Sequence, residues 1–376
     1  MSKSSPIAET MKALRLVEYN KDYQLHDNVA VPTPGPGEVL IRVSASGFCH
    51  TDLMVYHGIS QEPLPFIGSH EPAGTIVSLG SDVPDSWRVG DRVGVTNFQK
   101  PCDACTGCTW AKKTIKSLDP RFCENRTMCG ITRANGGFAE YMTASHDAVV
   151  HLPDEVSFEQ AAPLMCAGAT VWHAINQADL QKGQSVVIIG VGGLGVGGLG
   201  VGGLGVLGVQ FAKAQGYRVV AVDKHEIGLK LASEVPAHLK PDLIVNSNDK
   251  DTVQKISDFT DGLGLNAAIV CTGDDAANDW AAQRLQPRGV CVVVGFPEGG
   301  FKFDPMNLIF REIIVKGTIF CSMDEVRDMM AAVVEHGVLS PLTLIPIEEA
   351  EDIPTRVAAH AFTGRPVVTI GTEGQS

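Results

Sequence analysis

One segment near the middle of the chain constrains the fold more than any other. The apolar run QSVVIIG at 184–190 leads into a series of glycines, a helical pattern at 206–215 and a second apolar run at 217–223. The second run ends in an acidic residue, Asp223. A strand followed by glycines, a helix and another strand predicts a right-handed crossover between parallel strands. Backbone N–H groups in such a turn can approach a pyrophosphate, so the segment predicts dinucleotide binding.

The glycine turn is unusual because the pentapeptide VGGLG occurs three times in tandem, over 191–205. The first copy keeps the usual relation to the preceding strand, and the last keeps the usual spacing of about 20 residues to Asp223. Both relations hold only if about ten residues loop out, which costs little closure entropy, whereas ten residues added to the helix would rotate its faces by about 80°. We expect the loop; a flexible glycine-rich linker is the alternative. The glycines expected to approach the coenzyme are Gly190, Gly192 and Gly195 in the first copy and Gly200, Gly202 and Gly205 in the last.

The remaining chain divides into a β-rich part and an alternating part. Short Val/Ile-rich runs bounded by glycine and proline occupy the first ~165 residues, which predicts an irregular, barrel-like β domain. After residue 169, apolar strand patterns alternate with helix-length stretches, which predicts a doubly wound parallel sheet. We therefore expect an α/β protein with domains at 1–168 and 169–320, and a tail at 321–376 that returns to the first domain.

Bulk properties exclude several classes of protein. The formal net charge of the 376 residues is −13, and an acidic chain without a basic cluster argues against nucleic acid and anionic membranes as partners. The first residues lack a signal-peptide pattern, so we expect a cytoplasmic protein. The apolar stretch Val186–Val209 is long enough to cross a bilayer, but 11 of its 24 residues are glycine, which argues against a membrane span.

Cysteine and histidine residues suggest metal chemistry. Four of the ten cysteines crowd between Cys102 and Cys123, which in a reducing compartment predicts metal binding. Three other candidate ligands, Cys49, His70 and Cys166, lie far apart in the strings GFCHTD, IGSHEPAG and PLMCAGAT. Two thiolates and one imidazole leave the fourth tetrahedral position open, as a catalytic zinc requires. Their spacing alone does not prove a site.

These strings resemble those of the medium-chain, zinc-dependent alcohol dehydrogenases. The resemblance covers nearly the whole chain and includes GGFAEY at 136–141, VVVGFP at 292–297 and GRPVV at 364–368. It implies a GroES-like catalytic domain, a Rossmann coenzyme domain and a tail that packs on the catalytic domain. It also implies reversible oxidation of an alcohol with zinc and NAD, and assembly into a homo-oligomer, either a dimer or a tetramer.

The resemblance assigns roles around the catalytic metal. Cys49, His70 and Cys166 match the zinc ligands, and Glu71 matches the exchanging carboxylate beside the metal. Asp52 matches the carboxylate that accepts a hydrogen bond from the ligand histidine and fixes its tautomer.

Further positions match groups that handle the proton and the coenzyme. Thr51 matches the hydroxyl that receives the alcohol proton, and His50 and Arg365 match groups that contact coenzyme phosphates. The family's proton relay often ends in a histidine five residues after the first cysteine ligand, where this chain has Met54. We expect His50 or water to complete the relay, although His57 is also near in the sequence.

The cysteine-rich lobe, at about 100–130, resembles the family's structural zinc site. Cys102, Cys105 and Cys108 have the family's spacing, but the next cysteine, Cys123, follows fifteen residues later. We expect Cys123 to be the fourth ligand, displaced by an insertion, with Cys129 as the runner-up. A lobe of free thiols without zinc is the alternative.

Asp223 bears on the choice of coenzyme. Its carboxylate can accept hydrogen bonds from a ribose 2′-hydroxyl and repels a 2′-phosphate, which favours NAD over NADP, although Lys224 beside it weakens this argument. Two rival functions remain open at this stage: a zinc-free NADPH-dependent quinone or enone reductase, and a non-catalytic dinucleotide-binding protein. Cys271 and Cys291 lie in apolar strand patterns and are expected to be core residues.

Overall fold

A computed structural model describes residues 7–192 and 203–371, and the chain divides into two compact units. The first unit comprises 1–165, 344–355 and 367–376, and the second comprises 166–343 and 356–366. The tail therefore contributes to both units, and each is described by itself below.

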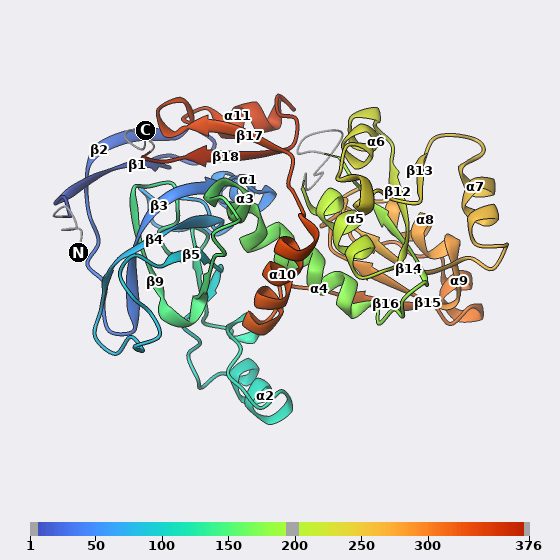
Figure 1. The fold of residues 1–376 in the computed structure, drawn as a ribbon, viewed down its shortest axis with the longest axis horizontal. Coiled ribbons are helices and arrows are strands. Elements are labelled where there is room, and N and C mark those ends of the chain that lie inside the picture. Colours follow the sequence, from blue (N-terminus) through green and yellow to red (C-terminus); the bar gives the residue numbers. More distant parts are fainter. Residues whose placement is uncertain (1–6, 193–202, 372–376) are drawn as a thin grey trace. The chain divides into compact units, whose positions relative to one another are not determined.

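The first unit is built on a seven-stranded sheet with the order β10-β5-β4-β3-β18-β17, in which β9 also pairs with β3 (Figure 1). The long strand β3 pairs antiparallel with β4, β9 and β18, so the tail completes the sheet. The strands associated with this unit are β1 (Thr10–Arg15), β2 (Gln24–Ala30), β3 (Glu38–Gly47), β4 (Pro72–Leu79), β5 (Arg92–Val95), β6 (Phe98–Gln99), β7 (Thr127–Cys129), β8 (Arg133–Ala134), β9 (Tyr141–Ser145), β10 (Val149–His151), β17 (Leu342–Pro346) and β18 (Arg365–Thr369).

Short helices connect these strands and carry several of the predicted site residues. Helix α1 follows β3 directly, and α3 precedes a π-helical turn at Leu164–Gly168. The helices are α1 (His50–Tyr56), α2 (Thr106–Thr114), α3 (Phe158–Pro163) and α11 (Ile353–Ala358).

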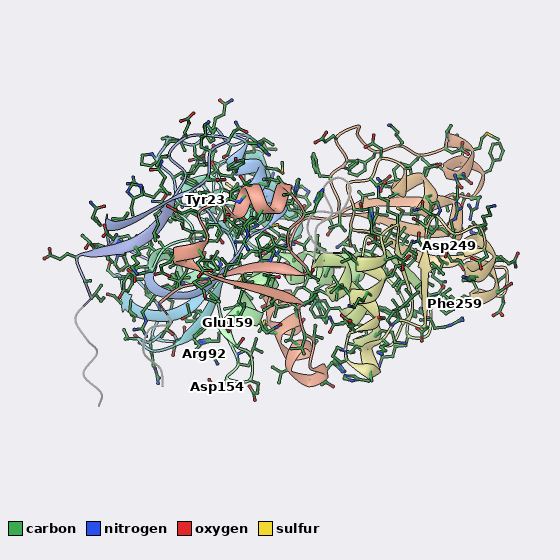
Figure 2. The ribbon with its side chains drawn as sticks, turned by 90° about the horizontal axis from the view of Figure 1, so that it is seen from above. Tyr23, Arg92, Asp154, Glu159, Asp249 and Phe259 are labelled. Atoms are coloured by element: carbon green, nitrogen blue, oxygen red, sulfur yellow. The ribbon has the colours of Figure 1, made fainter. Side chains whose placement is uncertain are left out.

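Arg92 on β5 fixes the segment that leads into α3 (Figure 2). Its guanidinium donates hydrogen bonds to the carbonyls of Pro153 (3.0 Å) and Val156 (2.6 Å) and lies 4.6 Å from the centre of the Phe158 ring. The segment before residue 166 is thus anchored to the sheet.

The second unit contains the predicted doubly wound parallel sheet, which is confirmed. Its strand order is β13-β12-β11-β14-β15-β16, and all neighbouring strands pair in parallel. Strand β11 is buried along its whole length, as expected for a sheet covered on both faces. The elements are β11 (Ser185–Ile189), β12 (Arg218–Asp223), β13 (Leu243–Asn246), β14 (Leu265–Val270), β15 (Leu285–Val293), β16 (Ile314–Gly317), α4 (Ala169–Gln177), α5 (Leu204–Ala214), α6 (Glu226–Ser233), α7 (Thr252–Phe259), α8 (Ala277–Arg284), α9 (Pro305–Phe310) and α10 (Met323–His336).

The structure also locates two expected core cysteines, whereas residues 193–202 of the candidate membrane stretch lie outside the described residues. Cys271 and Cys291 are completely buried, as expected. Within residues 7–192 and 203–371, no helix is long and apolar enough to span a bilayer.

The tail departs from the expected boundary at residue 321, because α10 belongs to the second unit. A capping box begins this helix: Ser322 Oγ accepts from the Glu325 backbone N–H, and the Glu325 carboxylate accepts from that of Ser322. The same carboxylate accepts hydrogen bonds from His173 (2.8 Å) and Asn176 (3.2 Å) on α4. These bonds hold α10 to α4 of the second unit, and within the tail the residues grouped with the first unit are 344–355 and those from 367 onward.

We predict that Glu325→Gln destabilises the protein by about 1–2 kcal/mol at neutral pH, since hydrogen bonds to a charged group are lost. Partial burial raises the pKa of Glu325, but the bonds from His173, Ser322 and Asn176 outweigh it and lower the pKa to about 2. The carboxylate therefore stabilises the fold above its unfolded pKa, and this contribution disappears as the pH falls from about 4.5 through 2. Urea unfolding at several pH values measures the difference in the free energy of unfolding between wild type and variant.

The exposed Glu335, on the same helix, supplies a matched control as Glu335→Gln, for which we expect little change. If Glu325→Gln lowered the free energy of unfolding by the same amount at pH 7 and at pH 3, the ionised Glu325 carboxylate would not be the source of this stability.

Candidate active site

A buried carboxylate, that of Asp52, organises the residues around the expected catalytic metal. Asp52 is completely buried in α1, and its Oδ2 accepts a hydrogen bond from the Cys49 backbone N–H at 2.7 Å. Its Oδ1 accepts from the Ser69 backbone N–H at 3.0 Å and lies 3.2 Å from His70 Nδ1. Because a carboxylate only accepts, Nδ1 carries the proton and Nε2 of His70 is left to bind a metal.

Ser69 and Gly47 shape the backbone beside His70. Ser69 is buried in the left-handed region with φ of 69°, and its hydroxyl bonds to the Gly47 carbonyl (2.7 Å) and to Ser46 Oγ (2.6 Å). A side chain at Gly47 would take the place of the Glu71 carboxylate and displace it from the cluster. Sequence reasoning missed Ser69; its only signal was a polar residue directly before the ligand histidine.

The structure brings together all four residues predicted for the catalytic zinc. One candidate ligand atom from each of Cys49, His70, Glu71 and Cys166 lies within 4.8 Å of the others. Cys166 follows Met165 directly, and Met165 packs where a side chain at Gly94 of β5 would clash with it. The chain connection therefore fixes the position of Cys166.

This donor set fits zinc. A tetrahedral zinc with bonds of about 2.0–2.3 Å places its ligand atoms about 3.3–3.8 Å apart, within the observed spread. Cys49, His70 and Glu71 are almost fully buried, and buried charges of this kind are found paired or bound to metal.

The candidate proton-relay residues lie on or next to α1. Thr51 is half-buried, and its hydroxyl lies 4.0 Å from Cys49 Sγ. His50 and Met54 are also half-buried. His57, by contrast, is exposed, and its Nδ1 is 2.7 Å from Asn20 Oδ1, so its ring is engaged at the surface.

The second cluster contains Cys102, Cys105, Cys108 and Cys123, whose sulfur atoms also lie within 4.8 Å of one another. Cys123, rather than Cys129, is therefore the fourth member. The insertion between Cys108 and Cys123 forms most of α2 and a 3₁₀ turn at Pro120–Phe122, which return the chain to the cluster.

Backbone donors favour thiolates in this lobe. Cys123 Sγ accepts from the N–H groups of Cys102 (3.2 Å) and Asn125 (3.3 Å). Hydrogen bonding from the backbone of Ala104 lowers the pKa of Cys102 to about 6. Burial raises the pKa of Cys108 to about 12, as it does that of Cys129, so the position of Cys123 and not the pKa values identifies the fourth member. The four-cysteine cluster therefore fits a structural zinc.

The glycine turn of the second unit joins the end of β11 to the start of α5. Gly190 has a φ of 87°, and a side chain at Gly205 would clash with the Gly190 carbonyl, so strand end and helix start are in close contact. The ten residues 193–202, which include Gly195, Gly200 and Gly202, lie outside the described residues. Of the six predicted glycines, the structure therefore describes Gly190 and Gly192 at the strand end and Gly205 at the helix start.

A pocket opens at the carboxyl ends of β11, β12, β13 and β14, where open α/β sheets bind ligands. Asp223 lines it and accepts from the backbone N–H groups of Gly192 (2.7 Å) and His225 (2.9 Å). Lys224 lines it too, with its ammonium 2.8 Å from the Asp274 carboxylate. Sequence reasoning missed Asp274 and Trp280, because nothing local shows that loops after β14 reach this pocket.

Arg365 lies at the other side of the glycine turn. It is completely buried, and its Cβ and Cδ are 3.9 Å from the position of a side chain at Gly203, the residue that precedes α5. Cationic groups beside a helix N-terminus favour phosphate, in agreement with the predicted coenzyme contact.

Comparisons with known proteins define the family. Residues 35–154 match the model of the alcohol dehydrogenase GroES-like domain, and residues 203–335 match that of the zinc-binding dehydrogenases. Alcohol dehydrogenase from Geobacillus stearothermophilus is 33% identical over 96% of this chain and 100% of its own length, and that from Rhizobium meliloti is 32% identical over 96% and 99%.

Solved structures agree with this. The alcohol dehydrogenase of Aeropyrum pernix aligns with a TM-score of 0.80 at 29% identity, covering 96% of this chain and 100% of its own. Acetophenone reductase from Geotrichum candidum, solved in complex with NAD, gives 0.80 at 26% identity, covering 98% and 100%. Fold and site together define a two-domain zinc-type dehydrogenase. The chain belongs to the medium-chain alcohol dehydrogenase family.

We predict two zinc ions per chain, and one after Cys123→Ser, because a structural tetrad loses its metal when a thiolate is removed. Elemental analysis of protein dialysed against a weak chelator measures this. Cys129→Ser is the matched control and should retain two. One zinc in the wild type, or equal loss in both variants, would show that the lobe does not bind metal through Cys123.

Proposed function

We propose that this protein is a zinc-dependent alcohol dehydrogenase that transfers a hydride between an alcohol and NAD. The observation that carries the proposal is the convergence of Cys49, His70, Glu71 and Cys166, with Asp52 fixing the histidine tautomer. A zinc-free reductase of the same superfamily has no use for a buried set of two thiols, an imidazole and a carboxylate.

The residues of α1 supply the proton pathway in this proposal. Bound zinc is a Lewis acid and lowers the pKa of a coordinated alcohol toward neutrality. The Thr51 hydroxyl, beside Cys49, accepts the alcohol proton and can donate its own, as a hydroxyl both accepts and donates. Asp52 accepts the hydrogen bond from His70 Nδ1, which leaves Nε2 directed to the metal.

The pocket at the end of β12 supports NAD as the coenzyme. Asp223 is nearly buried at the strand end, where its oxygens can also accept from ribose hydroxyls. The start of α5, with Arg365 beside Gly203, would hold the pyrophosphate. His50 is proposed as a further phosphate contact on the family resemblance alone. The NAD complex of the Geotrichum reductase is consistent with this choice.

We further propose a small primary alcohol as the substrate. Thr51 and Met54 stand three residues apart in α1, on one face of the helix. An unbranched apolar side chain beside the proton acceptor narrows the space for a substrate carbon chain.

The activity is tested by mixing zinc-loaded protein with NAD and a panel of primary, secondary and aromatic alcohols, while following NADH absorbance. We expect turnover with NAD that is fastest for short primary alcohols and lost in Cys166→Ser. Turnover only of enones with NADPH would favour the reductase, and no turnover despite bound zinc would favour a non-catalytic protein.

Because Met54 cannot shuttle protons and His57 is bonded to Asn20, we predict that His50 completes the relay with water. His50→Ala should lower kcat at neutral pH by about 10- to 100-fold, less at high pH, where solvent base removes the proton. The pH–rate profile is the measurement. His57→Ala should leave it unchanged, and an unaltered profile in His50→Ala would rule out the relay role.

A further inference from the structure

The pocket beside Asp223 contains an arrangement of charge that the sequence motif does not explain. Asp223, Lys224 and Asp274 all line it: Asp223 is the last residue of β12, Lys224 follows it, and Asp274 lies on the loop after β14. Their formal charges sum to −1. The pocket also includes His225 and Trp280, so a flat, partly polar ligand such as an adenosine group fits its lining.

Backbone hydrogen bonds already hold the Asp223 carboxylate. Both its oxygens accept backbone N–H groups, and it is 8% exposed, so it cannot turn toward Lys224. A side chain at Gly228 would clash with the same oxygen, Oδ2, so Gly228 packs closely against the carboxylate beside Gly192. Asp223 is therefore not the carboxylate that neutralises Lys224.

Asp274 is the carboxylate that neutralises Lys224. Its Oδ2 lies 2.8 Å from Lys224 Nζ, and its Oδ1 accepts the backbone N–H of Ala276 at 2.9 Å, which fixes the carboxylate in place. The hydrogen bond from Lys224 lowers the pKa of Asp274, so this carboxylate is ionised at neutral pH. Both side chains remain about one third exposed, so a ligand can reach them.

We propose that Asp274 determines the coenzyme specificity of this enzyme by neutralising Lys224, whose ammonium would otherwise attract the 2′-phosphate of NADP. The inference rests on the proposed use of NAD. A 2′-phosphate carries nearly two negative charges, and a Lys beside the ribose is the kind of group that accommodates it. With Lys224 paired to Asp274, the phosphate would meet a pocket of net charge −1.

A purely structural role for the ion pair makes a different prediction. An exposed salt bridge contributes little to stability, and its removal would then weaken or leave unchanged the binding of every adenine nucleotide alike. Control of specificity instead requires that removing the Asp274 charge improves binding of one ligand class only.

The test compares Asp274→Asn with wild type by calorimetric titration of AMP and adenosine 2′,5′-bisphosphate, which differ only in the 2′-phosphate. The Asn side chain can still accept the Ala276 N–H. We expect the variant to bind the bisphosphate about tenfold more tightly, the effect of one charge-assisted hydrogen bond, with AMP changed less than about twofold. The ratio of the two dissociation constants is the readout, and it needs no turnover.

Two variants serve as controls. Asp275→Asn removes the same charge one residue along, where the carboxylate pairs with Lys302 outside the pocket, and should leave the ratio unchanged. Adding Lys224→Met to Asp274→Asn should abolish the tighter binding of the bisphosphate. His225 is present in every variant, so its contribution cancels.

An unchanged ratio in Asp274→Asn, or an equal shift in Asp275→Asn, would overturn the specificity role while leaving NAD use intact. A wild type that binds NADP at least as tightly as NAD would instead overturn the proposed coenzyme, and the specificity role with it.

Discussion

The catalytic unit depends on one completely buried carboxylate. Asp52 is taken out of water, and such a charge is tolerated only when donors surround it. Its partners come from Cys49, Ser69 and His70, two of which are candidate metal ligands. A single side chain thereby sets the start of α1, the left-handed backbone at Ser69 and the orientation of an imidazole. Loss of any one partner would leave a buried charge undersatisfied, so the site is ordered as a unit.

In the second unit, backbone N–H groups likewise hold a carboxylate in place. Asp223 is held by two N–H groups and by the close approach of Gly192 and Gly228, so its position does not depend on a ligand. Gly205 and Gly190 allow the helix to begin against the strand end. Preorganised donors and acceptors lower the entropy lost on binding, which suits a site that must bind and release a coenzyme in each cycle.

Much of this architecture could be predicted from the sequence because its signals are local. Buried Val/Ile runs such as Ser185–Ile189 and the glycines before α5 predict the parallel sheet. The strings around Cys49, His70 and Cys166 predict a site whose members the chain separates by almost 120 residues. The choice of Cys123 over Cys129 also agrees with the cluster in the structure.

Other features depend on contacts between distant segments and have no local signal. The attachment of α10 to the second unit involves the contact of Glu325 with His173, 152 residues earlier. The partner of Lys224 is Asp274, 50 residues later. The two residues meet because β12 and β14 both lie next to β11 in the sheet, and this order of strands has no local signal in the sequence. The glycine turn is a different matter. The sequence shows the tandem copies, and the described part of the turn consists of the residues before 193 and after 202.

The contact of Gly205 with Gly190 has a consequence at the level of the gene. The strand contributes Gly190, which directly precedes the pentapeptide array, and the helix contributes Gly205, the last residue of the array. Each unit is encoded by five codons, so gain or loss of a whole unit preserves the reading frame. It also leaves glycine before the first unit and at the end of the last, which are the two residue types that this contact requires.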